Sequence, residues 1–465
     1  MRFASSAVCL LILSPAAACY DPADAGGGTA SSAEGSSSGA TDGTTVTTTA
    51  STTASTTATT TATTTATDVT TDEPTTSAGP GSDTDPTGND SSSSGGTTGE
   101  IVGCLDGLFV DDAPPLGDAV LVASLFNGQG IELVDVDDDG DLDLLVSDFG
   151  DGGGVNQAGV WYLAGDGAGG FAAPVQLPGG DTPAVRLAAA PIADDTVDVV
   201  AMVAVLPNYD LAVRRWRGNG DGTFLAPTNY ADAADWDVAL YDLDGDGRRD
   251  LLGTRSEGAR VSIATAAEGF GAPSDYGGLA TVNAIKGGDV DGDGDGDILS
   301  ASQGQLQLLR GDGAGGFGAV ETFALPGSAP IDVMIADFDG DGIMDLGTTW
   351  DAIVAVLEGD GAGGFGAASE LTVQGSTLAA TTPDFDGDGC SDIAVFNNTG
   401  SVSTIMGRDD FGFTDQHVFN IVPEGYPYDI ASGDVDGDQI ADIAVVTAGG
   451  GPESGGEIFV LRSGA

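Results

Sequence analysis

The sequence has little positive charge. Of its 465 residues only 13 are Lys or Arg, against 72 Asp or Glu, so the net charge is −59 at pH 7. A protein that binds nucleic acid needs a basic surface facing the phosphates, and this composition excludes nucleic acid as a main partner. Attachment to an anionic membrane through surface charge is excluded for the same reason.

The residues that most often carry catalysis are also scarce. Histidine and lysine occur once each, as His417 and Lys286. A Ser-His-Asp or Cys-His site can be built only around His417, and a zinc site with several His ligands is excluded. We see no cluster of a base with carboxylates outside the Asp-rich loops described below. The sequence therefore predicts that the protein is not an enzyme.

Long hydrophobic runs are absent, and a short one lies at the N-terminus. Residues 7–13 are apolar but too few to span a bilayer, and small residues follow them at 14–18. This pattern predicts an export signal over residues 1–18. The stretch AAAC at 16–19 resembles a bacterial lipobox, with Ala16 where Leu is usual, so Cys19 is the expected lipidation site. A plain secretory signal is the alternative.

Residues 19–103 contain mainly Thr, Ser, Ala, Gly, Asp and Pro. They cannot bury enough apolar surface to offset the entropy of ordering them, so we predict a disordered linker. We expect the chain to be exported, as an outer-membrane or cell-surface lipoprotein or as a secreted protein. It would touch a membrane only through the lipid.

The rest of the chain, 104–465, is predicted to be one folded domain built from repeats. Asp-rich segments of nine residues begin at 135, 242, 289, 337, 384 and 434. Most steps between them are close to 48 residues, and the first is about twice as long. A degenerate copy at 190–198, which keeps Asp194 and Asp198, fills that gap. Seven units result.

Each unit has the pattern of four short strands separated by Gly, Asp and Pro turn signals. No stretch has a convincing helical period. Repeated four-stranded units predict an all-β fold, a seven-bladed β-propeller. The last unit ends at its third strand, 458–465, and residues 106–116 read as the missing fourth strand. An N-terminal strand would thus complete the seventh blade and close the ring.

The Asp-rich loops have the chemistry of a calcium site. Asp stands at positions one, three, five and nine, and Gly stands at positions four and six of most copies. Position seven has no common side chain, as expected where the backbone carbonyl is the ligand. Hard oxygen ligands on a flexible loop favour calcium. Position twelve is never Glu, and strands flank the loops, which excludes an EF-hand.

We therefore predict about six calcium ions. The expected ligand residues, at positions one, three, five, seven and nine of each loop, are Asp135, Asp137, Asp139, Asp141 and Asp143; Asp242, Asp244, Asp246, Arg248 and Asp250; Asp289, Asp291, Asp293, Asp295 and Asp297; Asp337, Asp339, Asp341, Ile343 and Asp345; Asp384, Asp386, Asp388, Cys390 and Asp392; and Asp434, Asp436, Asp438, Ile440 and Asp442. Two of these loops depart from the Gly pattern, at Asp138 and at Gln439, and the second is expected to bind more weakly. The degenerate loop is expected to hold no ion.

These loops resemble those of FG-GAP (VCBS-type) repeats, the units of the seven-bladed propeller at the N-terminus of integrin α chains. The resemblance covers about 104–465, and the loop pattern matches fully at 242, 289, 337 and 384. It implies that each loop joins the first two strands of a blade and holds calcium on the lower face. Six such loops exceed the usual integrin number. The family includes adhesins, lectin-like binders and calcium-dependent polysaccharide lyases, so the resemblance leaves the activity open.

The opposite face is the expected ligand-binding face, since aromatic residues gather in its loops. The candidates are Tyr209, Trp236, Trp350, Tyr426 and Tyr428. Exposed aromatics beside polar groups suit contacts with sugars or proteins. Trp161 and Trp216, on third strands, are expected in the core instead.

We expect a calcium-binding surface or secreted propeller that recognises an extracellular protein or glycan. A calcium-dependent polysaccharide lyase or hydrolase and a purely structural envelope protein are the alternatives. The basic cluster Arg214, Arg215 and Arg217 is expected to pair with nearby Asp, with a groove for acidic polymers as its alternative. Cys104 and Cys390 can pair in an exported protein, but the sequence leaves open whether they lie close enough.

Overall fold

A computed structural model describes Cys104 and residues 116–464, apart from short gaps at 151–157, 180–181, 206–209, 232, 257, 267–268, 278–283, 303, 328–329, 422–424 and 450–454. All of these residues belong to the second of two units, Pro80–Ala465. The predicted signal peptide, the lipidation site Cys19 and the linker lie outside the described residues.

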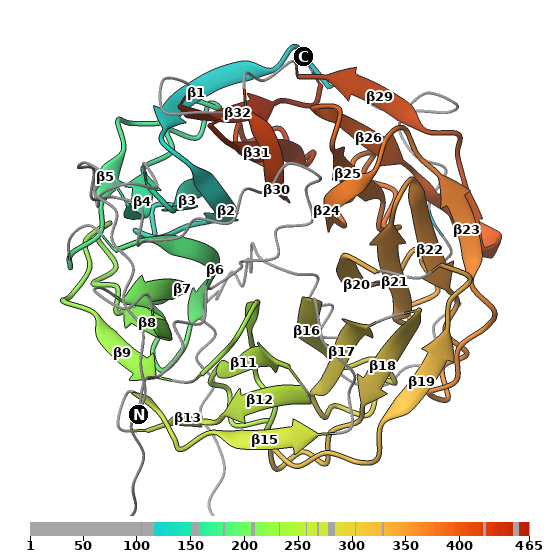
Figure 1. Ribbon diagram of the computed structural model, residues 1–465. Coiled ribbons are helices and arrows are strands. Elements are labelled where there is room, and N and C mark those ends of the chain that lie inside the picture. Colours follow the sequence, from blue (N-terminus) through green and yellow to red (C-terminus); the bar gives the residue numbers. More distant parts are fainter. Residues whose placement is uncertain are drawn as a thin grey trace, which may run out of the picture. The chain divides into compact units, whose positions relative to one another are not determined.

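Seven four-stranded antiparallel sheets stand around a ring (Figure 1). We number them as blades one to seven along the chain and give the strands from the centre of the ring outward. Blade one is β2 (Gly128–Val134), β3 (Asp143–Asp148), β4 (Gly159–Leu163) and β5 (Val175–Gln176); blade two is β6 (Ala184–Pro191), β7 (Val197–Val205), β8 (Asp210–Trp216) and β9 (Thr228–Ala231); blade three is β10 (Val238–Tyr241), β11 (Asp250–Arg255), β12 (Gly258–Ser262) and β15 (Ser274–Gly277). Blade four is β16 (Ala284–Gly288), β17 (Asp297–Ser302), β18 (Gln305–Leu309) and β19 (Glu321–Ala324); blade five is β20 (Asp332–Ala336), β21 (Asp345–Trp350), β22 (Ile353–Leu357) and β23 (Ser369–Thr372); blade six is β24 (Thr377–Thr381), β25 (Ile393–Asn397), β26 (Ser401–Ile405) and β29 (His417–Asn420); blade seven is β30 (Tyr426–Gly433), β31 (Asp442–Ala448), β32 (Gly456–Leu461) and β1 (Val120–Leu125). The predicted all-β, seven-bladed propeller is confirmed.

Helical structure is almost absent from the described part of the chain. A single 3-10 turn, η2 (Asp409–Phe411), joins two short strands, β27 (Gly407–Arg408) and β28 (Gly412–Phe413). A similar ribbon, β13 (Ala264–Thr265) with β14 (Gly269–Phe270), lies in blade three. Within the described ranges no helix is both long and apolar enough to cross a membrane.

The N-terminal strand closes the ring, as expected, but it is a different segment from the one we predicted. β1 pairs antiparallel with β32, Val120 opposite Val460, and becomes the outermost strand of blade seven (Figure 1). The prediction of this strand at 106–116 is wrong. That segment contains Pro114 and Pro115, which cannot donate to a ladder, whereas 120–125 is rich in β-branched and apolar residues that pack well on a sheet. Residues 106–115 themselves lie outside the described ranges.

The hydrophobic core is divided among the interfaces between blades. Each of seven clusters of buried side chains joins one blade to the next. One cluster includes Leu133 and Val146 of blade one together with Val446 and Val460 of blade seven, so the ring is also closed by packing. Since every blade is held by two neighbours, the loops at the strand ends are placed on a rigid frame.

Candidate metal centres

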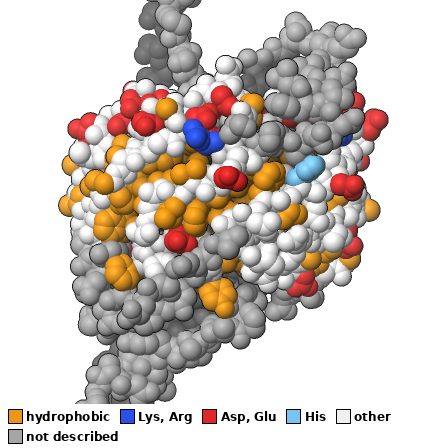
Figure 2. Space-filling view, turned by 90° about the horizontal axis from the view of Figure 1, so that it is seen from above, with side chains coloured by type: hydrophobic (Ala, Val, Ile, Leu, Met, Phe, Trp, Pro, Cys, Tyr) orange, Lys and Arg blue, Asp and Glu red, His pale blue; other side chains and the backbone are white. Residues whose placement is uncertain are grey.

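The six complete Asp loops occupy equivalent places in the fold. Each one joins the first strand of its blade to the second, so all of them lie on one face of the ring. The residue at position two points into the core: Leu243, Phe338 and Phe385 are fully buried there. This apolar anchor fixes the start of each loop, while its carboxylates remain near the surface. Figure 2 shows acidic side chains gathered toward one rim of the ring, with a hydrophobic band across the outer wall.

Two left-handed residues make each loop turn tightly. Positions four and six have a positive φ in all six loops, and Gly247 at position six has φ 84°. Asp138 at position four and Gln439 at position six have φ 60° and 71°, so they adopt the same conformation without being Gly. Side chains other than Gly are disfavoured in this region, so these two loops are strained at those positions.

The carboxylates at positions one and five hold the loop's own backbone. In the loop of blade three, Asp242 accepts hydrogen bonds from the N–H groups of Asp246 and Gly247, at 3.2 and 2.8 Å. Asp246 accepts one from the N–H of Arg248, at 3.0 Å. In the other five loops position one likewise accepts from the N–H of position six, and position five accepts from that of position seven. The further bond to position one comes from the N–H of position five in blades one and seven and from that of position four in blades four, five and six. The loop is thus folded around its carboxylates before any ligand is considered.

The carboxylate at position nine ties the loop to the third strand. One oxygen of Asp345 accepts from the N–H of Phe338 at 2.9 Å, and the other accepts from the N–H of Gly359 at 2.8 Å. All six position-nine residues make this pair of bonds and are at most 1% exposed. This residue therefore has a structural role in the loop as well as any role as a ligand.

The carboxylate at position three has one oxygen without a hydrogen-bond partner in most loops. Its other oxygen can be paired: Arg310 donates to Oδ2 of Asp291, and Tyr162 donates to Oδ2 of Asp137. One buried Oδ1 atom at this position has no hydrogen bond in four of the six loops, at Asp137, Asp244, Asp291 and Asp436. A buried carboxylate oxygen without a partner is costly, so four repeats of the same defect call for a common explanation. A cation bound among the loop carboxylates provides one.

The acidic side chains of a loop also converge on one point. In four of these loops, three carboxylate oxygens lie within 4.8 Å of one another; one such group is Asp289, Asp291 and Asp297. Burial raises the pKa of Asp143, Asp250, Asp297 and Asp442 to about 6 and that of Asp345 to about 7. Neighbouring loop carboxylates add to this shift because like charges disfavour ionisation. The donor set is all oxygen and negatively charged, and it fits calcium.

Position seven has no side chain common to the six loops. Arg248 pairs with Asp246 of its own loop, and Cys390 forms a disulfide with Cys104. That this position would bind an ion through its carbonyl stays a prediction. The sequence left open whether Cys104 and Cys390 lie close enough to pair; in the structure they do, with their Cα atoms 5.4 Å apart.

In blade two an arginine replaces one of the two backbone N–H groups that donate to the position-nine carboxylate. Its Asp198 accepts from the N–H of Gly218 at 2.9 Å, as its counterparts do, but position two is Pro191, which has no N–H to donate. Instead Arg215 donates from Nε at 2.8 Å and also from Nη2 to the second oxygen. Both side chains are almost completely buried. A guanidinium thus supplies the positive charge at this corner of blade two.

The other two arginines of the predicted basic cluster are also satisfied within blade two. Arg217 contacts Asp194 at 3.0 Å, and Arg214 donates to Asn229 and Thr182 at 2.9 and 3.0 Å. The expectation that this cluster pairs locally is confirmed for Arg215 and Arg217. The structure offers no free basic groove here for an acidic polymer.

The predicted ligand-binding aromatics divide into two groups. Trp236 and Tyr426 precede or begin first strands, on the face opposite the Asp loops, and they are 37% and 50% exposed. Trp350 is buried between blades four and five, so the expectation of an exposed side chain there is wrong. Tyr428 is half-buried beside Gln129, and Tyr209 lies outside the described residues.

A second charged group, at the centre of the ring, was missed by the sequence reading. Arg186 of blade two interacts electrostatically with Asp237, Asp332 and Asp429, which belong to blades three, five and seven. Side chains from these separate blades can meet only across the centre. Each of the three Asp residues lies five residues before the first residue of an Asp loop. This regular spacing is the sequence signal that could have revealed the central charged group.

These central carboxylates also connect neighbouring blades. Asp237 accepts from the N–H of Ile285 at 3.3 Å, and Asp332 accepts from the N–H of Ala380 at 2.9 Å. Lys286 and Glu132 complete the group, and enclosure raises the pKa of Glu132 to about 8. His417, in contrast, lies half-buried on the outermost strand β29, as expected for a surface or packing residue.

Comparisons with known proteins agree with the repeat and the fold. Residues 289–348 and 384–445 match the family model described as FG-GAP-like repeat, so the chain carries FG-GAP-like repeats. No curated protein matches the sequence. Among solved structures, BBS1N in complex with ARL6DN is 14% identical over 76% of this chain and 99% of that chain, with a TM-score of 0.51. An Agrocybe aegerita lectin specific for non-reducing terminal N-acetylglucosamine is 19% identical over 64% of this chain and 81% of its own, with a TM-score of 0.49.

Proposed function

We propose that this chain is a calcium-stabilised propeller that recognises an extracellular protein or glycan. The observation that carries the calcium part is the unpartnered Oδ1 atom at position three. It recurs in four loops, and in the loops of blades one, three and four it lies among carboxylates that converge on one point. Asp at positions one, three, five and nine, with the carbonyl of position seven, would hold the ion. Bound calcium would supply the positive charge that offsets their mutual repulsion.

Several features favour calcium over other metals. The donor set contains no imidazole, and the single histidine of the chain lies on β29, away from the loops. Carboxylate and carbonyl oxygens are hard ligands, and a flexible loop tolerates the irregular coordination of calcium better than the strict octahedron of magnesium. Extracellular calcium modules often bind at about 10⁻⁴–10⁻³ M, a range met outside cells. We therefore also propose that the chain is exported and works in a calcium-containing medium.

For the recognition role we propose the face opposite the Asp loops. Trp236 and Tyr426 expose large aromatic surfaces there. The charged group at the centre of the ring includes Arg186 and Asp237, and Asp237 directly follows Trp236 in the sequence. Aromatic surface beside polar groups is a common basis for binding sugars and proteins. We assign no catalytic role to Lys286 or His417.

The recognition role can be tested with the full-length protein on glycan and protein arrays in millimolar calcium. We expect a ligand whose affinity falls about tenfold or more in Trp236→Ala or Tyr426→Ala, since aromatic contacts of this kind dominate many interfaces. Leu225→Ala is the matched control, because Leu225 is also exposed but follows the Gly turn on the calcium face. Arrays without a specific ligand would favour a structural envelope protein. Binding that is insensitive to both aromatics would place recognition elsewhere.

A further inference from the structure

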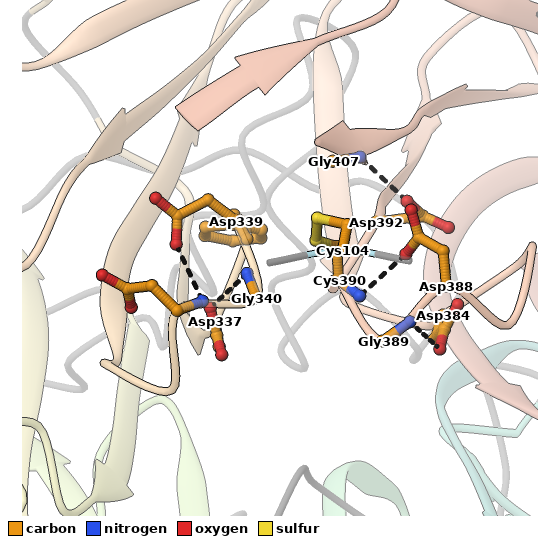
Figure 3. The surroundings of a disulfide bond; sticks show 12 residues. Cys104, Asp337, Asp339, Gly340, Asp384, Asp388, Gly389, Cys390, Asp392 and Gly407 are labelled. Atoms are coloured by element: carbon orange, nitrogen blue, oxygen red, sulfur yellow. Dashed lines mark hydrogen bonds between the residues drawn. A yellow bond between two sulfur atoms is a disulfide. The ribbon is translucent and has the colours of Figure 1, made fainter. Parts of the chain in front are cut away.

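The Cys104–Cys390 disulfide lies between two neighbouring Asp loops. Cys390 is position seven of the loop of blade six, and its N–H donates to Asp388 at 2.8 Å. On the other side is Gly340, in the loop of blade five. A Cβ atom on that glycine would lie 2.9 Å from the Cys104 nitrogen and 3.0 Å from the Cys390 sulfur. Figure 3 shows the disulfide between the two loops, with the carboxylates of both around it.

The loop of blade six is unusual in how deeply its carboxylates are buried. Asp386 and Asp388, at positions three and five, are 4% and 6% exposed. Position three is also buried in the neighbouring loop, at Asp339, whereas both positions are partly or fully exposed in the other four loops. One oxygen of Asp388 and the sulfur atoms of Cys104 and Cys390 all lie within 4.8 Å of one another. The buried carboxylates therefore coincide with the place where Cys104 packs.

We propose that the disulfide encloses the calcium centre of blade six, so that this ion exchanges much more slowly than the ions of the open loops. The inference rests on the proposed calcium sites. Two physical effects support it: the disulfide fixes position seven and its carbonyl, and carboxylates shielded from water attract a cation more strongly than exposed ones. An ion held in this way can leave only after the disulfide itself shifts away from the loop.

The coupling must act in both directions, because linkage between two equilibria is reciprocal. If the disulfide raises the calcium affinity of this loop, bound calcium must favour the disulfide by the same factor. A phosphine reductant converts the disulfide to two thiols and is itself oxidised to the phosphine oxide with an oxygen from water. Bound calcium should slow that reaction at Cys390.

The first test is the release of calcium from the full-length protein into excess fluorescent chelator, followed by stopped flow. We expect two phases, with the slow one at least about tenfold slower, within the range of typical coupling factors. Asp388→Asn should remove the slow phase. Asp246→Asn, the same change in the open loop of blade three, is the control and should reduce only the fast phase.

Loss of the disulfide provides the second test. In Cys104→Ser, and separately in wild-type protein after phosphine reduction, the slow phase should merge with the fast one. Alkylation of the Cys390 peptide, read by mass spectrometry, should proceed more slowly in calcium than in metal-free buffer. If calcium binds but release is unchanged without the disulfide, the enclosure is wrong and the calcium sites stand. If no calcium binds at all, the proposed function fails first.

Discussion

In blade two the Asp198 carboxylate meets the guanidinium of Arg215, whereas in the other six blades the equivalent carboxylate stands among further carboxylates. In both cases the carboxylate accepts a hydrogen bond from the backbone N–H of the glycine that follows the third strand, Gly218 in blade two and Gly311 in blade four. What differs is the source of positive charge. Blade two supplies it from Arg215. In other blades single arginines reach some of the loop carboxylates, as Arg310 reaches Asp291 and Arg462 reaches Asp436, and we propose that calcium supplies the rest.

This difference separates two roles of the loop carboxylates, one in the fold of the blade and one in the proposed binding of an ion. The buried carboxylate at position nine organises the blade in all seven cases, with or without further carboxylates around it. The carboxylates at positions one and three are missing from blade two, where Ala190 and Ile192 stand, while Asp194 keeps the carboxylate of position five. Positions one and three are thus dispensable for the fold of the blade, and we propose that in the other six blades they serve the ion. The predictions below use this contrast.

The largest expected effect is the response of the metal-free protein to pH. Burial raises the pKa of the position-nine carboxyls from 3.8 to about 6 in Asp143 and about 7 in Asp345. A group whose pKa is higher in the folded state stabilises the fold below its unfolded pKa, and this contribution is lost as pH rises through the folded pKa. In metal-free buffer we therefore expect the Tm to fall between about pH 4 and pH 7.

Saturating calcium should abolish or reverse this fall, because calcium binds the ionised carboxylates and competes with their protons. Thermal melts at pH 5 and pH 7.5, with and without calcium, provide the measurement. A metal-free Tm that rises steadily up to pH 7.5 would contradict the account of repelling carboxylates.

The next effect is the removal of the internal cation of blade two. Arg215→Met keeps the volume of the side chain but leaves Asp198 charged and buried, which typically costs about 3–5 kcal/mol. Urea unfolding should show this loss equally in calcium and in its absence. Adding Asp198→Asn should recover part of it. Arg217→Met, whose partner Asp194 is exposed, is the control and should change stability by about 1 kcal/mol or less.

A smaller effect is expected from one carboxylate of one open loop. Asp244→Asn should reduce the number of bound ions by one. At a calcium concentration of 100 times the Kd, losing that ion costs about 2.7 kcal/mol of stability. In metal-free buffer the same change should be neutral or stabilising, since it removes a repelling charge. Asp194→Asn in blade two should leave the ion count unchanged, and a drop in that variant would contradict the assignment of an arginine-filled blade.

The smallest effect concerns the strained residue of the last loop. Gln439 holds a φ of 71°, which Gly adopts without cost. Gln439→Gly should stabilise the calcium-bound protein by about 1 kcal/mol and tighten binding at that loop. Gly389→Gln, the reverse change at the same position of blade six, should have the opposite sign. Equal effects of both variants on Tm would show that backbone strain is not what distinguishes this loop.

The sequence predicted the period, the four strands per unit and the closure of the ring, because the Asp loops recur in phase and the strands between them are short and strongly patterned. It misplaced the closing strand, since a Gly-Phe pattern near residue 107 outweighed the β-forming run at 120–125. It also placed Trp350 on the surface, because a position at the end of β21 does not reveal whether the next blade covers it.

Contacts between separate blades were beyond sequence reasoning. Arg186 and Asp429 are 243 positions apart, yet their side chains approach to 3.9 Å across the ring. Within blade two, pairing Arg215 with Asp198 required the register of β8 beside β7, which places Arg215 opposite Val200, two residues from Asp198 along β7. Positions within one loop follow from local spacing. The Arg215–Asp198 pair follows from strand pairing within blade two, and the Arg186–Asp429 pair follows only from the closed arrangement of seven sheets.

The central claim is that six loops bind calcium and blade two does not. Calorimetric titration of the full-length protein with calcium, paired with thermal melting at each point, tests it most directly. We expect about six ions per chain and a Tm that rises with calcium, as linkage requires when an ion binds only the folded state. No bound calcium, or a melt indifferent to chelator, would contradict the account, and a seventh ion would contradict the role assigned to Arg215.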